Sequence, residues 1–369
     1  PNDLRTFLKE FLAAENTGLP AAPAFTATNS KQVTNVKPGY YILQVESYSK
    51  IYNTMLLFVG YKDGELVAEM DGNDMQGNPY MSGTEAGYTA TVKSQPGPTV
   101  EKYVFDDHDG QTALTTVGNW KSAAASQVGD EVNFAIKVEL PIYPDDADVT
   151  LTLKDTQQNL QYTSKDFDNI KVFYKSGEDK YSEVTNAVSG APDTYNSATG
   201  KQTMDITLNY GALKNTTATE FYVYYKATLK ENAVAGDNHN GTNTVTLDYS
   251  VKTSAGTYTG TPLAKVDVYT YNFDLTKYYN GDADGKHETS AEFSVFTAVS
   301  GNDVDNSSVM KFKKVTDADS KKEYYYPVAA TEIGDGIFTE IPADFEIRGL
   351  DVNTKYYVKE VKTPAGYYA

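Results

Sequence analysis

Apolar and polar residues alternate over short stretches along most of the chain. After residue 97 these stretches follow one another closely: EVNFAIKVEL, VTLTLKD, NIKVFY, QTMDITL, EFYVYYKATL and NTVTLDYSVK. A two-residue period is typical of a β-strand with one buried face. Because no long helical period separates the stretches, they predict a β-sandwich.

The first part of the chain has a different pattern. NDLRTFLKEFLAAE, residues 2–15, carries apolar residues at helical spacing, with Asn2 or Asp3 as a candidate N-cap. Alternating stretches then lead to a break rich in proline and glycine, SQPGPTV, and a later turn-rich break, TSAGTYTGTP, opens the last part. We therefore expect three domains, residues 1–96, 97–259 and 260–369. The predicted fold class is all-β: tandem immunoglobulin-like β-sandwiches, with a short N-terminal helix in the first domain.

Composition narrows the class of protein. The formal net charge of −18 argues against nucleic acid or an anionic membrane surface as a partner. No stretch is apolar enough to insert into a membrane, and an acidic, hydrophilic surface suits an extracellular protein. The chain has no cysteine, so disulfides cannot stabilise it. Another kind of cross-link is therefore worth seeking.

Three strands of the middle domain each place one polar residue on an otherwise apolar face. They are Lys102 between Val100 and Val104, Asp155 after Leu151 and Leu153, and Asn243 before Val245 and Leu247. Taken singly, each residue is most simply explained as lying at a strand end, where its polar group reaches solvent. Taken together, the three residue types suggest a reaction.

A lysine desolvated in a core loses its proton easily and becomes a nucleophile. A neighbouring carboxyl group can polarise an asparagine carbonyl and move protons. The amine then displaces ammonia and leaves a Lys–Asn isopeptide bond, favoured by the high effective concentration within one fold. We expect Lys102 to bond Asn243 with Asp155 as the catalytic acid, and Glu139 and Glu220 are the reserve carboxylates.

The last domain repeats part of this pattern. Lys277 shares a strand face with Phe273 and Leu275, and Glu360 shares one with Tyr356 and Val358. A carboxylate on a core face is costly unless it is paired or protonated. Lys277 is the obvious partner, although no asparagine follows Glu360 to serve as acceptor.

The last domain resembles a Cna-B-type domain of Gram-positive surface proteins. The matching stretches are VYTYNFDLTK, AEFSVF and GLDVNTKYYVKEVKTPAGY, the last of which is similar to the pilin E-box. The middle domain resembles the isopeptide-forming fimbrial domain in PTVEKYVFDD, VGDEVNFAIKVELP, LKDTQQNLQY and NTVTLDYS. The order of these domains is similar to that of major pilin subunits assembled by sortase.

The resemblance implies roles for particular residues. Glu360 would promote an isopeptide bond from Lys277, whose acceptor in the family lies in a final strand after the Gly-Tyr turn; that strand is not part of this sequence. Lys93, in TATVKSQPGP, would be the lysine joined to the next subunit, although the family's Tyr-Pro pair before it is absent. The alternative for Lys93 is an ordinary exposed linker lysine.

The resemblance further implies a structural shaft subunit of an extracellular, cell-wall-attached fimbria, with identical subunits as partners through sortase. The alternative is a cell-wall adhesin that binds a host matrix protein or glycan through residues 1–96. Apart from single-turnover bond formation we expect no enzyme activity, because no HExxH, GxSxG or phosphate-binding loop occurs.

No cofactor or metal is expected. NGDADGKHE spaces Asn280, Asp282 and Asp284 like the start of a calcium-binding loop, but the twelfth position is Ala291. A solvated hairpin turn explains this segment better.

Overall fold

The structure is a computed structural model. It describes residues 37–43, 50–52, 55–70, 81–84, 87–90, 94–105, 110–116, 120–143, 147–234, 240–253, 256–278, 290–317 and 320–366. The predicted N-terminal helix, Lys93 and the acidic segment 280–288 lie outside these residues.

Contacts divide the chain into two compact units. One comprises Pro1–Thr99, Glu139–Leu151 and Asp248–Pro262, and the other comprises Val100–Val138, Thr152–Leu247 and Leu263–Ala369. The second unit holds the strands that matter most for the predicted site.

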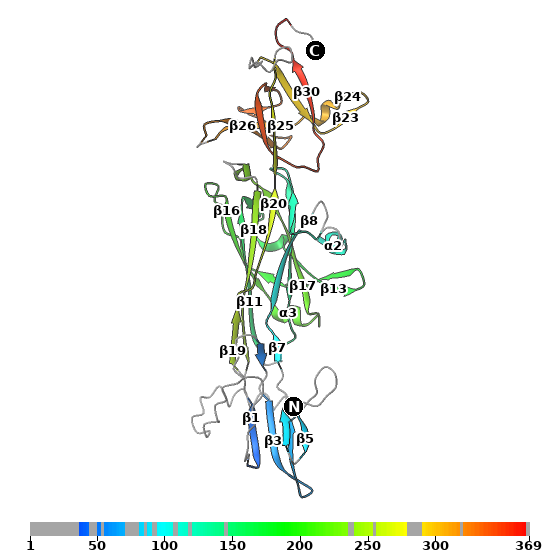
Figure 1. Cartoon of the computed structure of the whole chain (residues 1–369), viewed down its shortest axis with the longest axis vertical. Helices are drawn as coiled ribbons and strands as arrows, with labels where there is room; N and C mark the ends of the chain where they lie inside the picture. Colours follow the sequence, from blue (N-terminus) through cyan, green and yellow to red (C-terminus); the bar gives the residue numbers. More distant parts are fainter. Residues whose placement is uncertain are drawn as a thin grey trace. The chain divides into compact units, whose positions relative to one another are not determined.

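The described part of the first unit consists mainly of short antiparallel pairs (Figure 1). β1, β3 and β4 form a sheet in that order, β2 pairs with β7, and β5 pairs with β6. The bounds are β1 Gly39–Leu43, β2 Lys50–Tyr52, β3 Met55–Lys62, β4 Glu65–Met70, β5 Met81–Thr84, β6 Gly87–Ala90 and β7 Ser94–Pro96. Asp63 and Gly64 join β3 to β4 with φ of 53° and 88°, the positive values that a tight two-residue hairpin turn needs.

The first sandwich, most of which belongs to the second unit, pairs a six-stranded with a seven-stranded sheet. The former has the order β14-β13-β17-β10-β8, with β12 beside β17. Its strands are β8 Thr99–Phe105, β10 Glu131–Glu139, β12 Leu160–Gln161, β13 Lys171–Gly177, β14 Lys180–Glu183 and β17 Glu220–Leu229.

The seven-stranded sheet has the order β15-β16-β11-β18-β20-β9, with β19 beside β18. Its strands are β9 Ala123–Ala125, β11 Asp148–Gln158, β15 Val188–Ser189, β16 Lys201–Leu208, β18 Asn240–Thr253, β19 Gly256–Gly260 and β20 Leu263–Tyr269. The alternation predicted from the sequence is visible in β16, where Met204, Ile206 and Leu208 are buried while Lys201 and Asp205 are exposed. Side chains at every second position thus build the core between the sheets.

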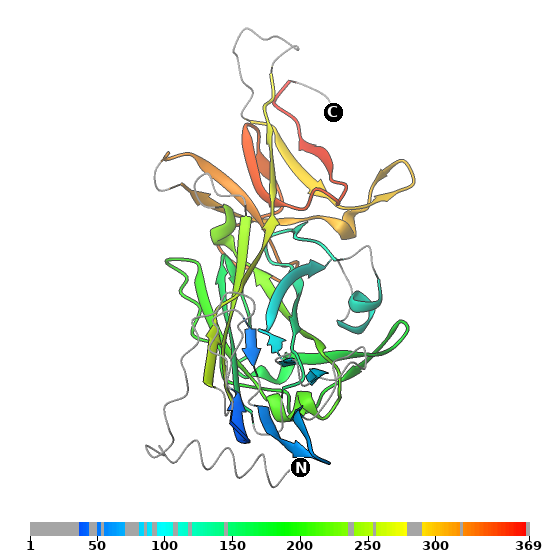
Figure 2. The ribbon, with the colours of Figure 1, turned by 60° about the horizontal axis from the view of Figure 1, so that its bottom comes forward.

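Short helices connect some of these strands. They are α2 Gly110–Thr115 and α3 Tyr210–Lys214, with 3₁₀ turns η2 Phe167–Asn169 and η3 Glu231–Val234 here and η5 Asn306–Ser308 in the last part of the chain. Asn209 caps α3, because its side chain accepts a hydrogen bond from the Ala212 amide at 3.2 Å. Figure 2 shows the green β13–β14 hairpin projecting from the sandwich.

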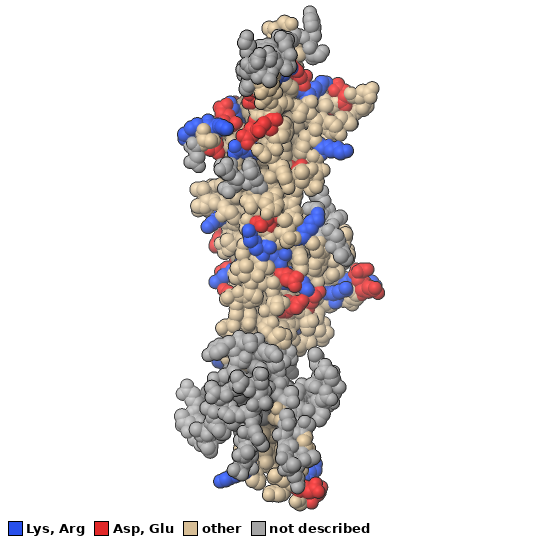
Figure 3. Space-filling view, in the orientation of Figure 1, with Lys and Arg blue, Asp and Glu red and all other residues tan. Residues whose placement is uncertain are grey.

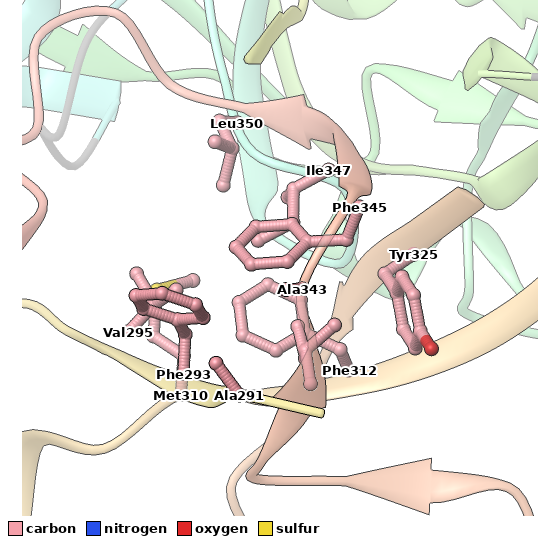
Figure 4. Close-up of a cluster of buried hydrophobic side chains, with 11 residues drawn as sticks. Ala291, Phe293, Val295, Met310, Phe312, Tyr325, Ala343, Phe345, Ile347 and Leu350 are labelled. Atoms are coloured by element: carbon pink, nitrogen blue, oxygen red, sulfur yellow. The ribbon is translucent and has the colours of Figure 1, made fainter. Parts of the chain in front are cut away.

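A second, smaller sandwich follows. One sheet has the order β21-β29-β26-β25-β27, a second has the order β28-β22-β30, and β23 and β24 form a hairpin. The bounds are β21 Tyr271–Leu275, β22 Glu292–Phe296, β23 Val299–Ser300, β24 Asp303–Val304, β25 Lys311–Thr316, β26 Glu323–Val328, β27 Ile337–Phe338, β28 Ile341–Pro342, β29 Phe345–Leu350 and β30 Tyr357–Lys362. Figure 4 shows its core, in which Phe293, Phe312 and Phe345 lie among Tyr325 and smaller apolar side chains.

The all-β prediction with tandem sandwiches is confirmed. No helix in the described residues is long and apolar enough to cross a membrane. Those residues also contain no group of three or more His, Cys, Asp or Glu side chains arranged to hold a metal ion. On the face drawn in Figure 3, acidic and basic side chains are interspersed.

Within the second unit the two sandwiches meet at a small apolar cluster: Val128, Val234, Tyr324 and Tyr326. The Val128 amide donates a hydrogen bond to the Gly349 carbonyl at 2.9 Å. Arg348 lies with its guanidinium 4.3 Å from the centre of the Tyr324 ring and donates to the Val234 carbonyl at 3.3 Å. Gly349 has a φ of +84°, and a Cβ there would lie 2.8 Å from Val128 Cγ2.

We predict that Gly349→Ala destabilises the fold more than Gly336→Ala. Both glycines have nearly the same φ, +84° and +85°, but a Cβ on Gly336 would meet nothing within 4 Å. In both variants the left-handed backbone conformation lowers the free energy of unfolding by about 1–2 kcal/mol. Only in Gly349→Ala does a steric clash lower it by a further amount of about 1–3 kcal/mol. Chemical denaturation followed by circular dichroism measures the free energy of unfolding of both variants. Equal decreases would show that Val128 moves aside at no measurable cost and would contradict the prediction.

Candidate functional site

Four strands contribute polar side chains to one group in the core of the first sandwich. Lys102 comes from β8 and Tyr225 from β17 in the six-stranded sheet, while Asp155 comes from β11 and Asn243 from β18 in the seven-stranded sheet. The side chains of Lys102 and Asp155 are 0% exposed. Asn243 and Tyr225 are equally enclosed. The structure therefore brings together the three residues predicted from alternation, away from solvent.

The four side chains form one hydrogen-bonded group. The Lys102 amine forms an ion pair with Asp155 Oδ2. It also donates to Tyr225 Oη at 2.8 Å. Tyr225 Oη donates to Asp155 Oδ2 at 2.7 Å and accepts from Asn243 Nδ2 at 2.7 Å. One hydroxyl oxygen thus connects the amine, the carboxyl group and the amide.

Two buried oxygen atoms in this region have no hydrogen-bond partner: Asn243 Oδ1 and Gln157 Oε1. Gln157 lies two residues after Asp155 on β11, and its Nε2 donates to Asp155 Oδ1 at 3.3 Å. A buried oxygen without a partner is uncommon in folded proteins and usually needs an explanation. For Asn243 the unpartnered atom belongs to the carbonyl group that the predicted reaction would attack.

Aromatic rings enclose the amine. Lys102 Nζ lies 5.9 Å from the centre of the Phe134 ring and 5.3 Å from that of Tyr225. Burial lowers the pKa of the Lys102 ammonium below its usual value, and the charge and hydrogen bond of Asp155 oppose this shift. Burial also raises the pKa of the Tyr225 hydroxyl, with Asp155 adding to the rise. The environment therefore makes the Lys102 ammonium easier to deprotonate than an exposed lysine and keeps the Tyr225 phenol protonated.

This arrangement has the parts needed for amide exchange. A neutral amine is a nucleophile, and the Asn243 amide is an acceptor held at the same hydroxyl group. Asp155 can take the ammonium proton directly, since it already pairs with Lys102. Because one folded core holds the amine and the amide together, the reaction is intramolecular. Its effective concentration, and so its rate, is much higher than for two separate molecules.

The reserve carboxylates have other surroundings. Glu139 is exposed and accepts a hydrogen bond from Thr99 Oγ1 at 3.4 Å. Glu220 pairs with Lys137 at 3.1 Å, and its side chain is 36% exposed. Asp155 is the carboxyl group in direct contact with Lys102.

The structure also pairs Lys277 with Glu360. Lys277 Nζ lies 2.5 Å from Glu360 Oε2, and their side chains are 31% and 22% exposed. Glu360 Oε1 is buried and has no hydrogen-bond partner. Tyr356 packs against the core as expected. Val358 pairs in register with the buried Val295 but is itself 41% exposed, so this strand face is covered only in part.

Tyr225 and Gln157 were not predicted from the sequence. Tyr225 alternates with the apolar residues Phe221 and Val223 in EFYVYYKATL. Tyrosine is common on strands, so its presence there gave no signal. Gln157 lies two residues after Asp155 and so points to the same face of the strand. A second polar residue on that inward face was the one sequence signal that could have identified it.

No protein-family model matches the chain, and neither does any curated protein. Among solved structures, the chain is similar to the full-length major pilin SpaD from Corynebacterium diphtheriae, with 16% identity over 90% of this chain and 71% of that chain and a TM-score of 0.45. It is also similar to BcpA, the major pilin subunit of Bacillus cereus, with 20% identity over 89% of this chain and 75% of that chain and a TM-score of 0.45. A third similar structure is the RrgB pilus protein from Streptococcus pneumoniae, with 13% identity over 85% and 71% of the two chains and a TM-score of 0.41.

We predict that free Lys102 makes stability rise with pH. Asn243→Ala removes the amide, so Lys102 stays an amine whose pKa in the fold is below the 10.5 of the unfolded chain. Between these two values the unfolded state binds more protons, so the free energy of unfolding should increase with pH by up to about 1.4 kcal/mol per unit. The added stability is fully present above the pKa that Lys102 has in the unfolded chain. It is lost as the pH falls from there to the lower pKa of Lys102 in the fold.

Denaturation of Asn243→Ala between pH 8 and 10 measures this slope. The control is Lys102→Met/Asp155→Asn/Asn243→Ala, which lacks both ionisable groups. Parallel pH profiles for the two proteins would contradict the lowered pKa of Lys102.

Proposed function

We propose that the chain is a structural shaft subunit of a covalently polymerised bacterial surface pilus, stabilised by an autocatalytic isopeptide bond between Lys102 and Asn243. The observation that carries the proposal is the enclosed, hydrogen-bonded group of a lysine, a carboxyl group and an amide in the core of the first sandwich. A buried ion pair is seldom stabilising compared with apolar packing. A chemical role explains its presence better.

The reaction balances within the group. Lys102 gives its ammonium proton to Asp155, and the neutral amine attacks Asn243 Cγ while the carbonyl electron pair moves to Oδ1. The bond between Cγ and Nδ2 then breaks as the carbonyl re-forms, and a second Nζ proton reaches the departing nitrogen. The products are the isopeptide bond, ammonia and a neutral Asp155. Two buried charges are thereby removed from the core, which favours the product.

The bond would tie β8 of one sheet to β18 of the other. About 140 residues lie between its ends, and on the model used for disulfides such a loop closure stabilises the fold by about 5 kcal/mol. Segments between the linked strands would also resist extraction under force and digestion by proteases. These are properties that a load-bearing filament needs.

Further parts of the proposal concern the domains and their linkage. The domains are 1–96, 97–259 and 260–369. In the last domain Lys277 and Glu360 supply an amine and a carboxyl group, but no asparagine follows Glu360 in this sequence, so within it Lys277 is expected to stay unbonded. Lys93 would join each subunit to the next through sortase, in a fimbria attached to the outer cell wall. Identical subunits are thus the main partners.

We predict that a pilus-specific sortase converts the chain, carrying its sorting signal, into covalent ladders on denaturing gels. Lys93→Ala should abolish the ladders, because the nucleophile of the subunit linkage is lost. Lys62→Ala is the matched control, since Lys62 is also in the first unit and its side chain is 66% exposed.

Each outcome bears on a different part of the proposal. Ladders that persist in Lys93→Ala would refute the role of Lys93. The absence of ladders from the unaltered chain, together with micromolar binding of residues 1–96 to a matrix protein or glycan, would favour an adhesin over a shaft subunit.

A further inference from the structure

Tyr225 forms hydrogen bonds with both reacting side chains in the core of the first sandwich. Its Oη accepts from the Lys102 amine at 2.8 Å and from the Asn243 amide nitrogen at 2.7 Å, and it donates to Asp155 Oδ2 at 2.7 Å. A phenol has one donor and two acceptor positions, so these three bonds use its full capacity. Every hydrogen-bonding position of Tyr225 is therefore directed at the reaction.

The ring is held firmly in place. Tyr225 is 0% exposed and stacks on Phe134, with ring centres 5.6 Å apart and planes at 22°. Tyr162 packs edge-on against it at 6.2 Å. A side chain fixed on two sides keeps its hydroxyl oxygen at one position, as a catalytic group requires.

The atom of Asn243 that Tyr225 contacts is the nitrogen that must leave. Asp155 Oδ2 bonds Lys102 and Tyr225, and Asp155 Oδ1 accepts from Gln157. In the described residues, the path of hydrogen bonds from Asp155 to Asn243 Nδ2 passes through Tyr225 Oη. A proton that reaches the leaving nitrogen along these bonds therefore crosses the phenol.

We propose that Tyr225 is the general acid of the cross-linking reaction and protonates Asn243 Nδ2 as ammonia departs. This inference rests on the proposed bond between Lys102 and Asn243. Before attack the amide nitrogen only donates, but in the tetrahedral intermediate it gains a free electron pair and becomes an acceptor. The hydroxyl hydrogen then turns from Asp155 towards the nitrogen.

The relay returns Tyr225 to its starting state and leaves Asp155 in the protonated form that it reached in the first proton transfer. Tyr225 gives its proton to Nδ2 and receives one from the protonated Asp155, which in turn takes a proton from Lys102 Nζ. The bond between Cγ and Nδ2 breaks with its electron pair on nitrogen, and no other reactant is needed. Because burial keeps the pKa of Tyr225 above its usual value, the phenol holds its proton until the intermediate forms.

The test is a refolding time course. The full chain is recovered unreacted in urea and diluted to start folding, and samples quenched in acid are weighed by mass spectrometry. Each bond lowers the mass by about 17 Da, the ammonia lost in the displacement. We expect Tyr225→Phe to slow this loss by about 10²-fold or more, the usual contribution of general acid catalysis.

Tyr224→Phe is the matched control. Tyr224 is the neighbouring residue on β17, and its hydroxyl donates to Asn133 at 2.6 Å. The Tyr224→Phe variant should lose ammonia at the rate of the unaltered chain. Lys102→Ala should never lose this ammonia, which assigns the mass change to the predicted bond.

The results separate the inference from the proposed function. If the unaltered chain loses no ammonia, the cross-link itself is refuted. If it does and folded Tyr225→Phe reacts equally fast, only the role of Tyr225 is refuted. Site-specific 3-fluorotyrosine at position 225 keeps the shape but makes the phenol more acidic, so it should speed the reaction. An unchanged rate would rule out proton transfer from this hydroxyl.

Discussion

The burial of the Lys102 amine is the constraint on which the rest of the first sandwich depends. Removing an ammonium group from water destabilises the fold by several kcal/mol, and its ion pair with Asp155 offsets only part of this desolvation cost. Two neighbours lower the remaining desolvation cost of the ammonium group. Tyr225 accepts a hydrogen bond from it, and the ring of Phe134 lies 5.9 Å from it, a cation–π distance. Conversion of the amine to an amide would remove the charge altogether. On the proposed reaction, the site would therefore be least costly to the fold once the bond had formed.

The sandwich supplies what such a reaction needs. Lys102 and Asn243 are far apart in sequence and lie on different sheets, so the reacting pair assembles only when the sheets pack. Water is excluded at the same moment, which lowers the pKa of the amine. Folding and activation are thus one event. The partly exposed Lys277–Glu360 pair has the amine and the carboxyl group but lacks this complete enclosure.

Strand alternation was enough to predict the inward faces of Lys102, Asp155 and Asn243, because the two-residue period of a strand depends on local sequence alone. The same argument paired Lys277 with Glu360. It could not identify Tyr225, since only packing distinguishes a tyrosine whose hydroxyl meets three partners from one that faces solvent. Nor could it predict the exposure of Val358, which depends on how much of a sheet edge is covered. The contact between Val128 and Gly349 depends on how the two sandwiches pack within the second unit, and strand periodicity carries no information on that packing.

Tryptic mapping of the denatured chain tests the central claim most directly. An isopeptide bond on Lys102 blocks cleavage after it, so the account predicts one branched peptide in which residues 94–121 are joined to residues 231–252 with the loss of one ammonia. Fragmentation should place the branch between Lys102 and Asn243. Separate linear peptides 94–102, 103–121 and 231–252 would contradict the account, because they require a free Lys102 and an intact Asn243.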